Sequence, residues 1–168
     1  LACTVMVADC LPVLITDTEG RAVAAAHAGW RGLAGGVLER TLERFRALAL
    51  SGHAQPAIKN EAMELIAWLG PCIGPQVFEV VPEVRAAFVD ADDGAAACFV
   101  PQAGGKYLAD LPALARRRLS ASGVARLFGN DGSAAWCTVQ QPARYFSYRR
   151  DQARLGGTGR MAACIWLA

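Results

Sequence analysis

Three short apolar runs open the chain, and the turns between them are too short to hold a helix. Residues 3–7 and 12–16 are expected to be strands, and the DTEG sequence that follows is typical of a hairpin turn. Residues 21–26 form the next expected strand, which ends at His27. Parallel strands need crossover connections of about a dozen residues or more. This run of strands therefore argues against a doubly wound parallel sheet.

After Gly32 the hydrophobic pattern becomes helical. Apolar side chains recur about every 3.6 residues from Leu33 to Leu48, and glutamates and arginines occupy the opposite face. This segment is the strongest predicted helix, and residues 51–62 after it have the composition of a loop. Two more helices are expected, at residues 82–89 and in the amphipathic stretch that stops at Gly123. Further strands are expected within ELIAWL and at residues 98–100, 136–139, 145–148 and 161–167.

Strands and helices interleave over 168 residues, which predicts a single domain spanning residues 1–168. The first three strands are joined by short turns, while later strands are separated by helices. We therefore expect an α+β fold in which mixed β-sheets, arranged like a sandwich, are flanked by helices. The chain starts without a methionine and directly in strand-like sequence, so a segment before residue 1 is expected to be missing.

Composition excludes several classes of protein. Hydrophobic residues make up 54% of the chain, yet no apolar run reaches the roughly 18–20 residues that would span a bilayer. A formal net charge of +2 indicates no preference for polyanions, so neither a nucleic acid nor a membrane is a predicted partner. The six cysteines are scattered without a CxxC pair, which favours reduced thiols and a cytoplasmic location.

Cys10 and His27 are the first candidates for chemistry. Each lies at the end of a predicted strand, and the hairpin between them is expected to bring both ends to one edge of the sheet. The histidine can take the thiol proton to create a nucleophile, or both side chains can bind zinc. A buried thiol packed near a structural histidine is the third interpretation. The other histidine, His53, lies in a polar loop and is expected to be solvated.

Two arginine-containing segments are candidates for binding an anion. The GWRG sequence combines Arg31 and Gly32 with an aromatic ring and the free N–H groups of a helix start, an arrangement that suits phosphate or carboxylate. The same glycines could simply permit a tight turn. Arg149 and Arg150 lie beside aromatic residues in YFSYRRD, where they either clamp an anion or form a solvated edge paired with Asp151.

Six stretches, in order, resemble the YfiH-type family, also called the laccase-domain or multicopper polyphenol oxidoreductase family. They are ADCLPVL, AAAHAGWRGLAGGVLE, WLGPCIGPQVFEV, KYLADL, FSYRRD and TGRMAACIWL. The resemblance implies a fold similar to the catalytic domain of cytotoxic necrotizing factor toxins. This sequence departs from the family pattern at Val7, where a threonine is usual, and at residues 152–157, where a lengthened loop is expected.

The resemblance implies a zinc site built from one cysteine and two histidines. Cys10 corresponds to the family's cysteine and His27 to one histidine, while the other histidine lies upstream of residue 1. Copper in the same pocket is the alternative metal. A multicopper oxidase needs a histidine-rich trinuclear cluster as well as a further copper site, and the two histidines of this chain are too few for it.

Members of the family are purine nucleoside enzymes, which implies phosphorolysis of adenosine, inosine or methylthioadenosine and deamination of adenosine. The expected ligands are thus zinc, a purine nucleoside and phosphate, with Arg31, Gly32, Arg149 and Arg150 as substrate-binding residues and Cys10 and His27 as catalytic and metal-binding residues. Two other functions stay open. One is a thiol hydrolase or amidase that uses Cys10 as nucleophile on a small or peptidoglycan-related substrate, and the other is a zinc-stabilised module without enzymatic activity.

Overall fold

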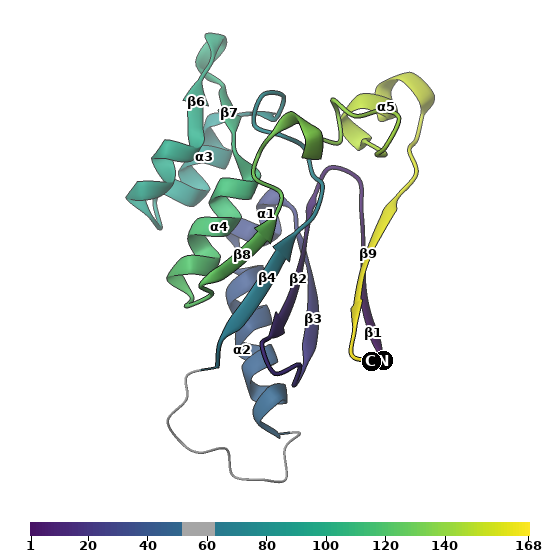
Figure 1. The fold of residues 1–168 in the computed structure, drawn as a ribbon. Coiled ribbons are helices and arrows are strands. Elements are labelled where there is room, and N and C mark those ends of the chain that lie inside the picture. Colours follow the sequence, from purple (N-terminus) through teal and green to yellow (C-terminus); the bar gives the residue numbers. More distant parts are fainter. Residues whose placement is uncertain (52–62) are drawn as a thin grey trace.

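The computed structural model describes residues 1–51 and 63–168, and its central element is a four-stranded mixed sheet (Figure 1). The strands β2 (Leu11–Asp17), β3 (Val23–Ala28), β4 (Leu65–Leu69) and β8 (Arg126–Gly129) lie in the order β3-β2-β4-β8. The pairs β2–β3 and β2–β4 are antiparallel, whereas β4–β8 is parallel. The prediction of mixed sheets in an α+β fold is confirmed. The predicted loop at residues 51–62 lies outside the described residues, except for Ser51.

Helices cover one face of this sheet. Leu11, Val13 and Ile15 alternate along β2 and are fully buried, as expected for the core-facing side of a strand. The helices α2 (Val37–Ser51) and α4 (Leu111–Ala121) pack over that face and contribute buried leucines to the same core. None of the described helices is long and apolar enough to cross a membrane.

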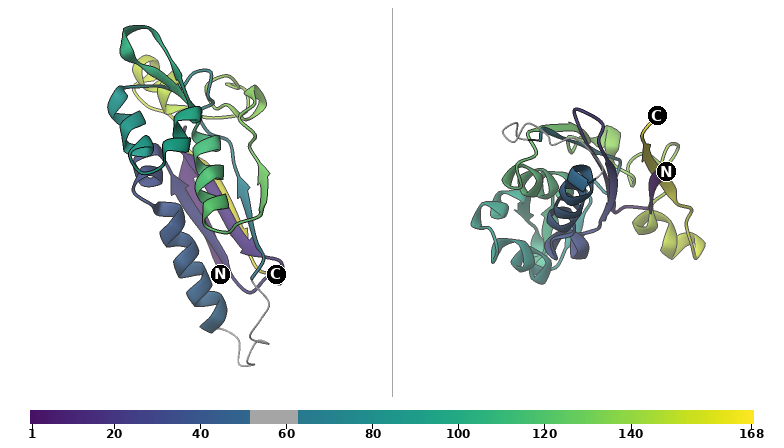
Figure 2. Two further views of the ribbon diagram at one scale, coloured as in Figure 1. Left: turned by 90° about the vertical axis from the view of Figure 1, so that its left-hand side faces the viewer. Right: turned by 90° about the horizontal axis from the view of Figure 1, so that it is seen from below.

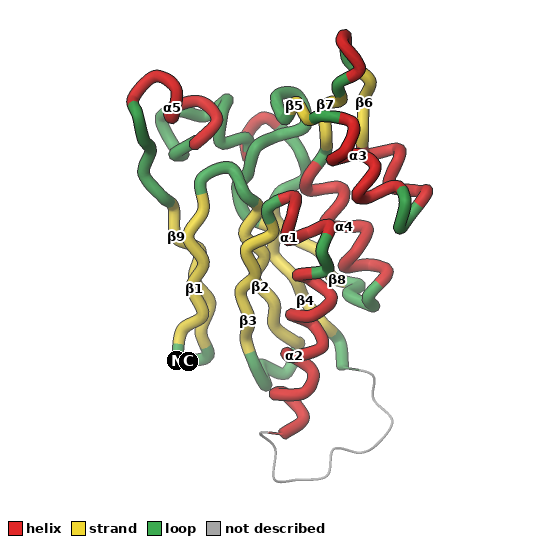
Figure 3. Tube along the Cα trace, turned by 180° about the vertical axis from the view of Figure 1, so that it is seen from behind, coloured by secondary structure: helices red, strands yellow, loops and turns green. Residues whose placement is uncertain are grey.

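A two-stranded ribbon lies on the opposite side of the sheet from the helices. It consists of β1 (Ala2–Val7) and β9 (Met161–Trp166), which pair antiparallel with Val7 opposite Met161. Seen from below, helices, sheet and ribbon form three successive layers (Figure 2). The ribbon brings the two chain ends side by side (Figure 3).

A smaller sheet and short helices complete the fold. The sheet consists of β5 (Glu79–Val80), β7 (Tyr107–Ala109) and β6 (Phe99–Pro101) in that order, and it lies with α3 (Pro82–Val89) beyond the end of the large sheet (Figure 1). The described residues also form three 3-10 turns: η1 (Asp93–Cys98), η2 (Ala103–Gly105) and η3 (Ala134–Trp136). The helix predicted at residues 82–89 is thus confirmed to the residue.

The first long helix differs from its prediction. It is divided into α1 (Trp30–Ala34) and α2, because Gly36 between them has φ +84°, a left-handed conformation that no regular helix contains. The preceding strand also extends further than expected, so His27 lies within β3 rather than after it.

The predicted strands at residues 136–139 and 145–148 are wrong. At the first, η3 leads into a single bridge between Cys72 and Cys137 instead of a ladder. At the second, Ser147 caps α5 (Tyr148–Leu155) by accepting a hydrogen bond from Arg150 N. The lengthened loop expected at residues 152–157 is therefore mainly the second half of this helix.

Candidate active site

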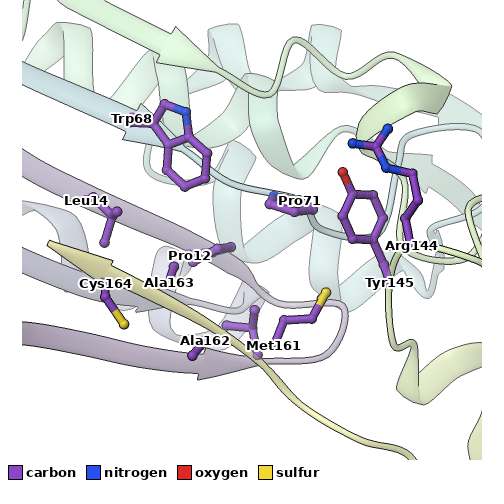
Figure 4. A pocket seen from close by; sticks show the side chains of 11 residues that line it. Pro12, Leu14, Trp68, Pro71, Arg144, Tyr145, Met161, Ala162, Ala163 and Cys164 are labelled. Atoms are coloured by element: carbon purple, nitrogen blue, oxygen red, sulfur yellow. The ribbon is translucent and has the colours of Figure 1, made fainter.

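A cavity of about 440 Å³ opens where the β1–β2 turn, the start of α1 and the start of α5 meet. Both Cys10 and His27 line it. Its other lining residues are Ala8, Asp9, Gly29, Trp30, Arg31, Ile73, Phe78, Leu111, Tyr148, Arg149 and Arg160. A second cavity, of about 420 Å³, lies between the ribbon and the sheet (Figure 4). The second cavity is mostly apolar and is lined by neither a histidine nor a carboxylate, so the first is the candidate site.

The hairpin register brings Cys10 and His27 together, as predicted from the sequence. Leu11 pairs with Ala28 and Pro12 with His27, so Cys10 lies beside the residue that follows β3. That residue is Gly29, and a Cβ added there would lie 2.7 Å from the Cys10 Sγ. Cys10 is half-buried and His27 is exposed.

Asp9 holds the turn that presents Cys10. It has φ +83°, the one left-handed conformation among the non-glycine residues that the structure describes. Its carboxylate Oδ1 accepts a hydrogen bond from Thr138 Oγ1 at 2.5 Å, and Oδ2 accepts one from Arg149 N at 2.6 Å. Its backbone oxygen accepts a hydrogen bond from Ile73 N. Three segments distant in sequence therefore meet at this one residue.

The surroundings of Cys10 favour the neutral thiol. Burial raises the pKa of the Cys10 thiol, the charge of Asp9 raises it further, and the charge of Arg160 lowers it. Thiolate is the form that attacks substrates and binds metals. A further cation near the sulfur, such as a bound metal ion, would favour the thiolate.

Cys10 and His27 fit part of a zinc site. Thiolate and imidazole are the donors that zinc prefers, and structural or catalytic zinc sites use three or four protein ligands. No group of three or more such donors occurs within residues 1–51 and 63–168. The oxygens of Asp9 already accept hydrogen bonds from the protein. These two side chains would thus need a further donor, and His53 lies outside the described residues.

Three arginines line the cavity: Arg31, Arg149 and Arg160. Arg31 stacks over the Trp30 ring at 4.4 Å from its centroid. Arg149 donates to the backbone oxygen of Glu79 at 3.4 Å, and Arg160 donates to that of Gly159 at 3.2 Å. Among the described residues, none of the three arginines forms an ion pair with a carboxylate. The cavity therefore carries positive charge suited to an anion.

Arg150 and Gly32, which were also predicted to bind substrate, lie elsewhere. The Arg150 guanidinium donates to the backbone oxygens of Thr138 at 2.7 Å and Tyr145 at 3.0 Å, and it pairs with Asp151 at 2.7 Å. This arginine holds the pKa of Asp151 below its usual range. Gly32 lines another groove, along α1 and α2, which shares Arg31 with the candidate site.

The sequence reasoning missed Arg160, Phe78 and Tyr148 as cavity residues. Arg160 is the arginine of the TGRM motif, directly before the closing strand, so a chemistry-bearing residue at a strand end was the available signal. Phe78 and Tyr148 carried no such signal, because their positions depend on how distant segments pack.

Comparisons with known proteins agree on one family. The family model described as "Multi-copper polyphenol oxidoreductase laccase" matches residues 1–168. The protein named purine nucleoside phosphorylase YfiH of Escherichia coli (strain K12) is 49% identical over 165 residues, which cover 98% of this chain and 59% of that protein. A protein named purine nucleoside phosphorylase from Pseudomonas aeruginosa is 48% identical over 168 residues, covering 99% of this chain and 61% of that protein.

Solved structures give the same result. The crystal structure of Neisseria meningitidis protein NMB0706 matches with a TM-score of 0.81 and 48% identity, covering 99% of this chain and 60% of that one. That of a Bacillus licheniformis hypothetical protein YfiH matches with a TM-score of 0.81 and 27% identity, covering 100% and 58%. The chain spans about three fifths of the length of these relatives. By its sequence and its fold, the chain belongs to the laccase-domain family of YfiH proteins.

Proposed function

We propose that this chain carries the active site of a purine nucleoside phosphorylase. One observation supports the proposal above all: Cys10 and His27 line a single cavity with three arginines that form no ion pair with a carboxylate among the described residues. The names of the curated relatives point to the same reaction. The substrates would be a purine nucleoside such as adenosine, inosine or methylthioadenosine, and phosphate.

The reaction joins phosphate to the sugar and releases the base. A phosphate oxygen forms a bond to C1′ of the ribose while the bond from C1′ to the base nitrogen breaks. The base leaves with that electron pair and gains a proton. Arg31 and Arg149 bind and orient the phosphate, because guanidinium groups match phosphate oxygens in charge and in geometry. The exposed ring of Tyr148 offers the purine a stacking surface.

Cys10 and His27 would hold the metal, which we propose to be zinc, with copper as the alternative. Bound there, the ion would supply a Lewis acid beside the substrate. The same centre would also serve the deamination of adenosine at the purine C6 position. The left-handed turn at Asp9 directs Cys10 toward Gly29, so its hydrogen bonds orient one of the two donors.

A thiol hydrolase is the alternative that the same two residues allow. In it, His27 takes the proton of Cys10, and the sulfur attacks a substrate carbonyl. The raised pKa of the thiol makes this reaction harder without a metal. We therefore place phosphorolysis first.

The test uses the full-length natural protein, stripped of metal and reloaded with zinc, and follows adenosine by chromatography. We expect adenine and ribose phosphate to form only when phosphate is present, activity to disappear on chelation, and zinc to restore it. Cys10→Ala should abolish turnover, whereas the matched control Cys164→Ala, an exposed cysteine on β9, should retain it. Full activity without metal, or with Cys10→Ala, would sink the proposal.

A further inference from the structure

Arg160 reaches the cavity from the far end of the chain. Val7 pairs with Met161, so the residue before β9 and the turn after β1 leave the ribbon at the same end. That turn contains Cys10, and both residues line the same cavity. A partner 150 positions away in the sequence is thus built into the candidate site by the ribbon that joins the two chain ends.

Specific contacts fix the segment that carries Arg160. A Cβ added to Gly159 would lie 2.7–2.8 Å from three atoms of the Phe146 ring, so the backbone packs directly on that ring. One residue earlier, Thr158 Oγ1 donates a hydrogen bond to Asp151 Oδ2 at 3.2 Å. The approach to Arg160 is therefore anchored to α5 and to the segment before it.

The donors of Arg160 are mostly available to a ligand. Within the described residues its guanidinium donates one hydrogen bond, from Nη1 to the Gly159 oxygen, and forms no ion pair. A guanidinium group carries five N–H donors in a planar fork. The lining of the cavity thus holds three arginines and one carboxylate, Asp9, whose two oxygens accept hydrogen bonds from the protein.

We propose that Arg160 is a phosphate-binding residue, which acts with Arg31 and Arg149 as a three-arginine site for the phosphate co-substrate. The inference rests on the proposed phosphorolysis, and it adds Arg160 to the two arginines already proposed to bind phosphate. A phosphate dianion has enough oxygen acceptors for three guanidinium groups. The three arginines come from α1, α5 and the segment before β9, and all three line the same cavity.

The test compares Arg160→Gln and Arg160→Lys in the full-length natural protein. Isothermal titration calorimetry with inorganic phosphate gives Kd, and the phosphorolysis assay gives KM for phosphate and for adenosine. We expect Arg160→Gln to raise the Kd and KM for phosphate by about tenfold to a hundredfold, the range for one charged hydrogen-bonding group. The KM for adenosine should change less than twofold. Arg160→Lys should fall between wild type and Arg160→Gln, because lysine keeps the charge and loses the fork.

Arg126→Gln is the matched control. Arg126 lies on β8, is 47% exposed at its side chain and does not line the cavity, so its loss should leave phosphate binding unchanged. Circular dichroism and the thermal midpoint establish that each variant is folded. Wild-type affinity for phosphate in Arg160→Gln, or no phosphate binding by the wild type, overturns the inference. If phosphate binds and Arg160→Gln weakens it, but no nucleoside is cleaved, the phosphate site stands and the proposed phosphorolysis fails.

Discussion

At the scale of single residues, Gly29 determines how closely the sulfur of Cys10 approaches β3. Its φ of −68° and ψ of 161° suit any residue, so an alanine there would cause no backbone strain. Its Cβ would nevertheless lie 2.7 Å from Sγ. We expect Gly29→Ala to displace the sulfur, to cost about 1–3 kcal/mol of unfolding free energy through overpacking, and to reduce kcat/KM by about tenfold to a hundredfold.

Urea unfolding and steady-state kinetics check this prediction. Gly157→Ala is the control, because a Cβ at Gly157 meets no atom within 4 Å and the residue has no left-handed φ. The control should stay within about 0.5 kcal/mol of wild type. Equal kinetics for the Gly29 variant and the control would contradict the role of close approach.

The residues of the candidate site differ in whether their presence at the cavity could be predicted from the sequence. Cys10 and His27 were predictable, since one hairpin joins them and a hairpin is a local structure. Tyr148 was not, because its place depends on how α5 docks, and for Arg160 the sequence offered only its position before a strand, while its place at the cavity depends on the β1–β9 pairing. Arg150 shows the converse error: it sits next to Arg149 in sequence, yet successive helical residues point in different directions.

At the scale of elements, α5 is held to its neighbours through Arg150 and Asp151. Arg150 holds the pKa of Asp151 below its usual value, so the charged carboxylate is favoured in the folded state. Such a group contributes stability above the unfolded pKa of about 3.9, and this stability is lost as pH falls through the folded-state pKa. Arg150→Gln should therefore lower stability at pH 7 and flatten its fall below about pH 4.

Chemical denaturation from pH 7 to pH 2 measures this effect. Arg154→Gln is a suitable control, because Arg154 is 71% exposed at its side chain and lies 3.9 Å from the same carboxylate. That variant should keep both the stability at pH 7 and the acid dependence of wild type. If the unfolding free energy of Arg150→Gln falls with decreasing pH as steeply as that of wild type, the ion pair does not hold the helix.

Elements were predictable where local signals and tertiary packing agree. The helix at residues 82–89 has a proline in its first turn and buries Val84 and Phe88, so its period and its packing coincide. Residues 145–148 are rich in aromatic side chains, as strands often are, but no neighbouring strand pairs with them in the described structure. The cap that Ser147 provides for α5 decides the outcome there.

At the scale of the whole molecule, Asp9 joins the β1–β2 turn to Thr138 and Arg149, which lie 129 and 140 positions later in the sequence. Its side chain accepts hydrogen bonds from Thr138 and from Arg149 N in the first turn of α5, so one carboxylate links the β1–β2 turn to both segments. Three variants separate its contributions. Asp9→Gly keeps the left-handed backbone and loses both acceptors, Asp9→Ala adds backbone strain, and Asp9→Asn keeps one acceptor oxygen.

We expect Asp9→Gly to lower the unfolding free energy by roughly 2–4 kcal/mol, since two hydrogen bonds to a buried charged group are lost. Asp9→Ala should cost about 1 kcal/mol more, because alanine resists a positive φ. Asp9→Asn should cost least, since asparagine tolerates the left-handed region, but its amide group faces one of the two donors. Urea unfolding gives the order, and phosphate titration by calorimetry reports whether Arg149 keeps its place. Wild-type stability and phosphate affinity in Asp9→Gly would mean that the ribbon and the core assemble the cavity without this link.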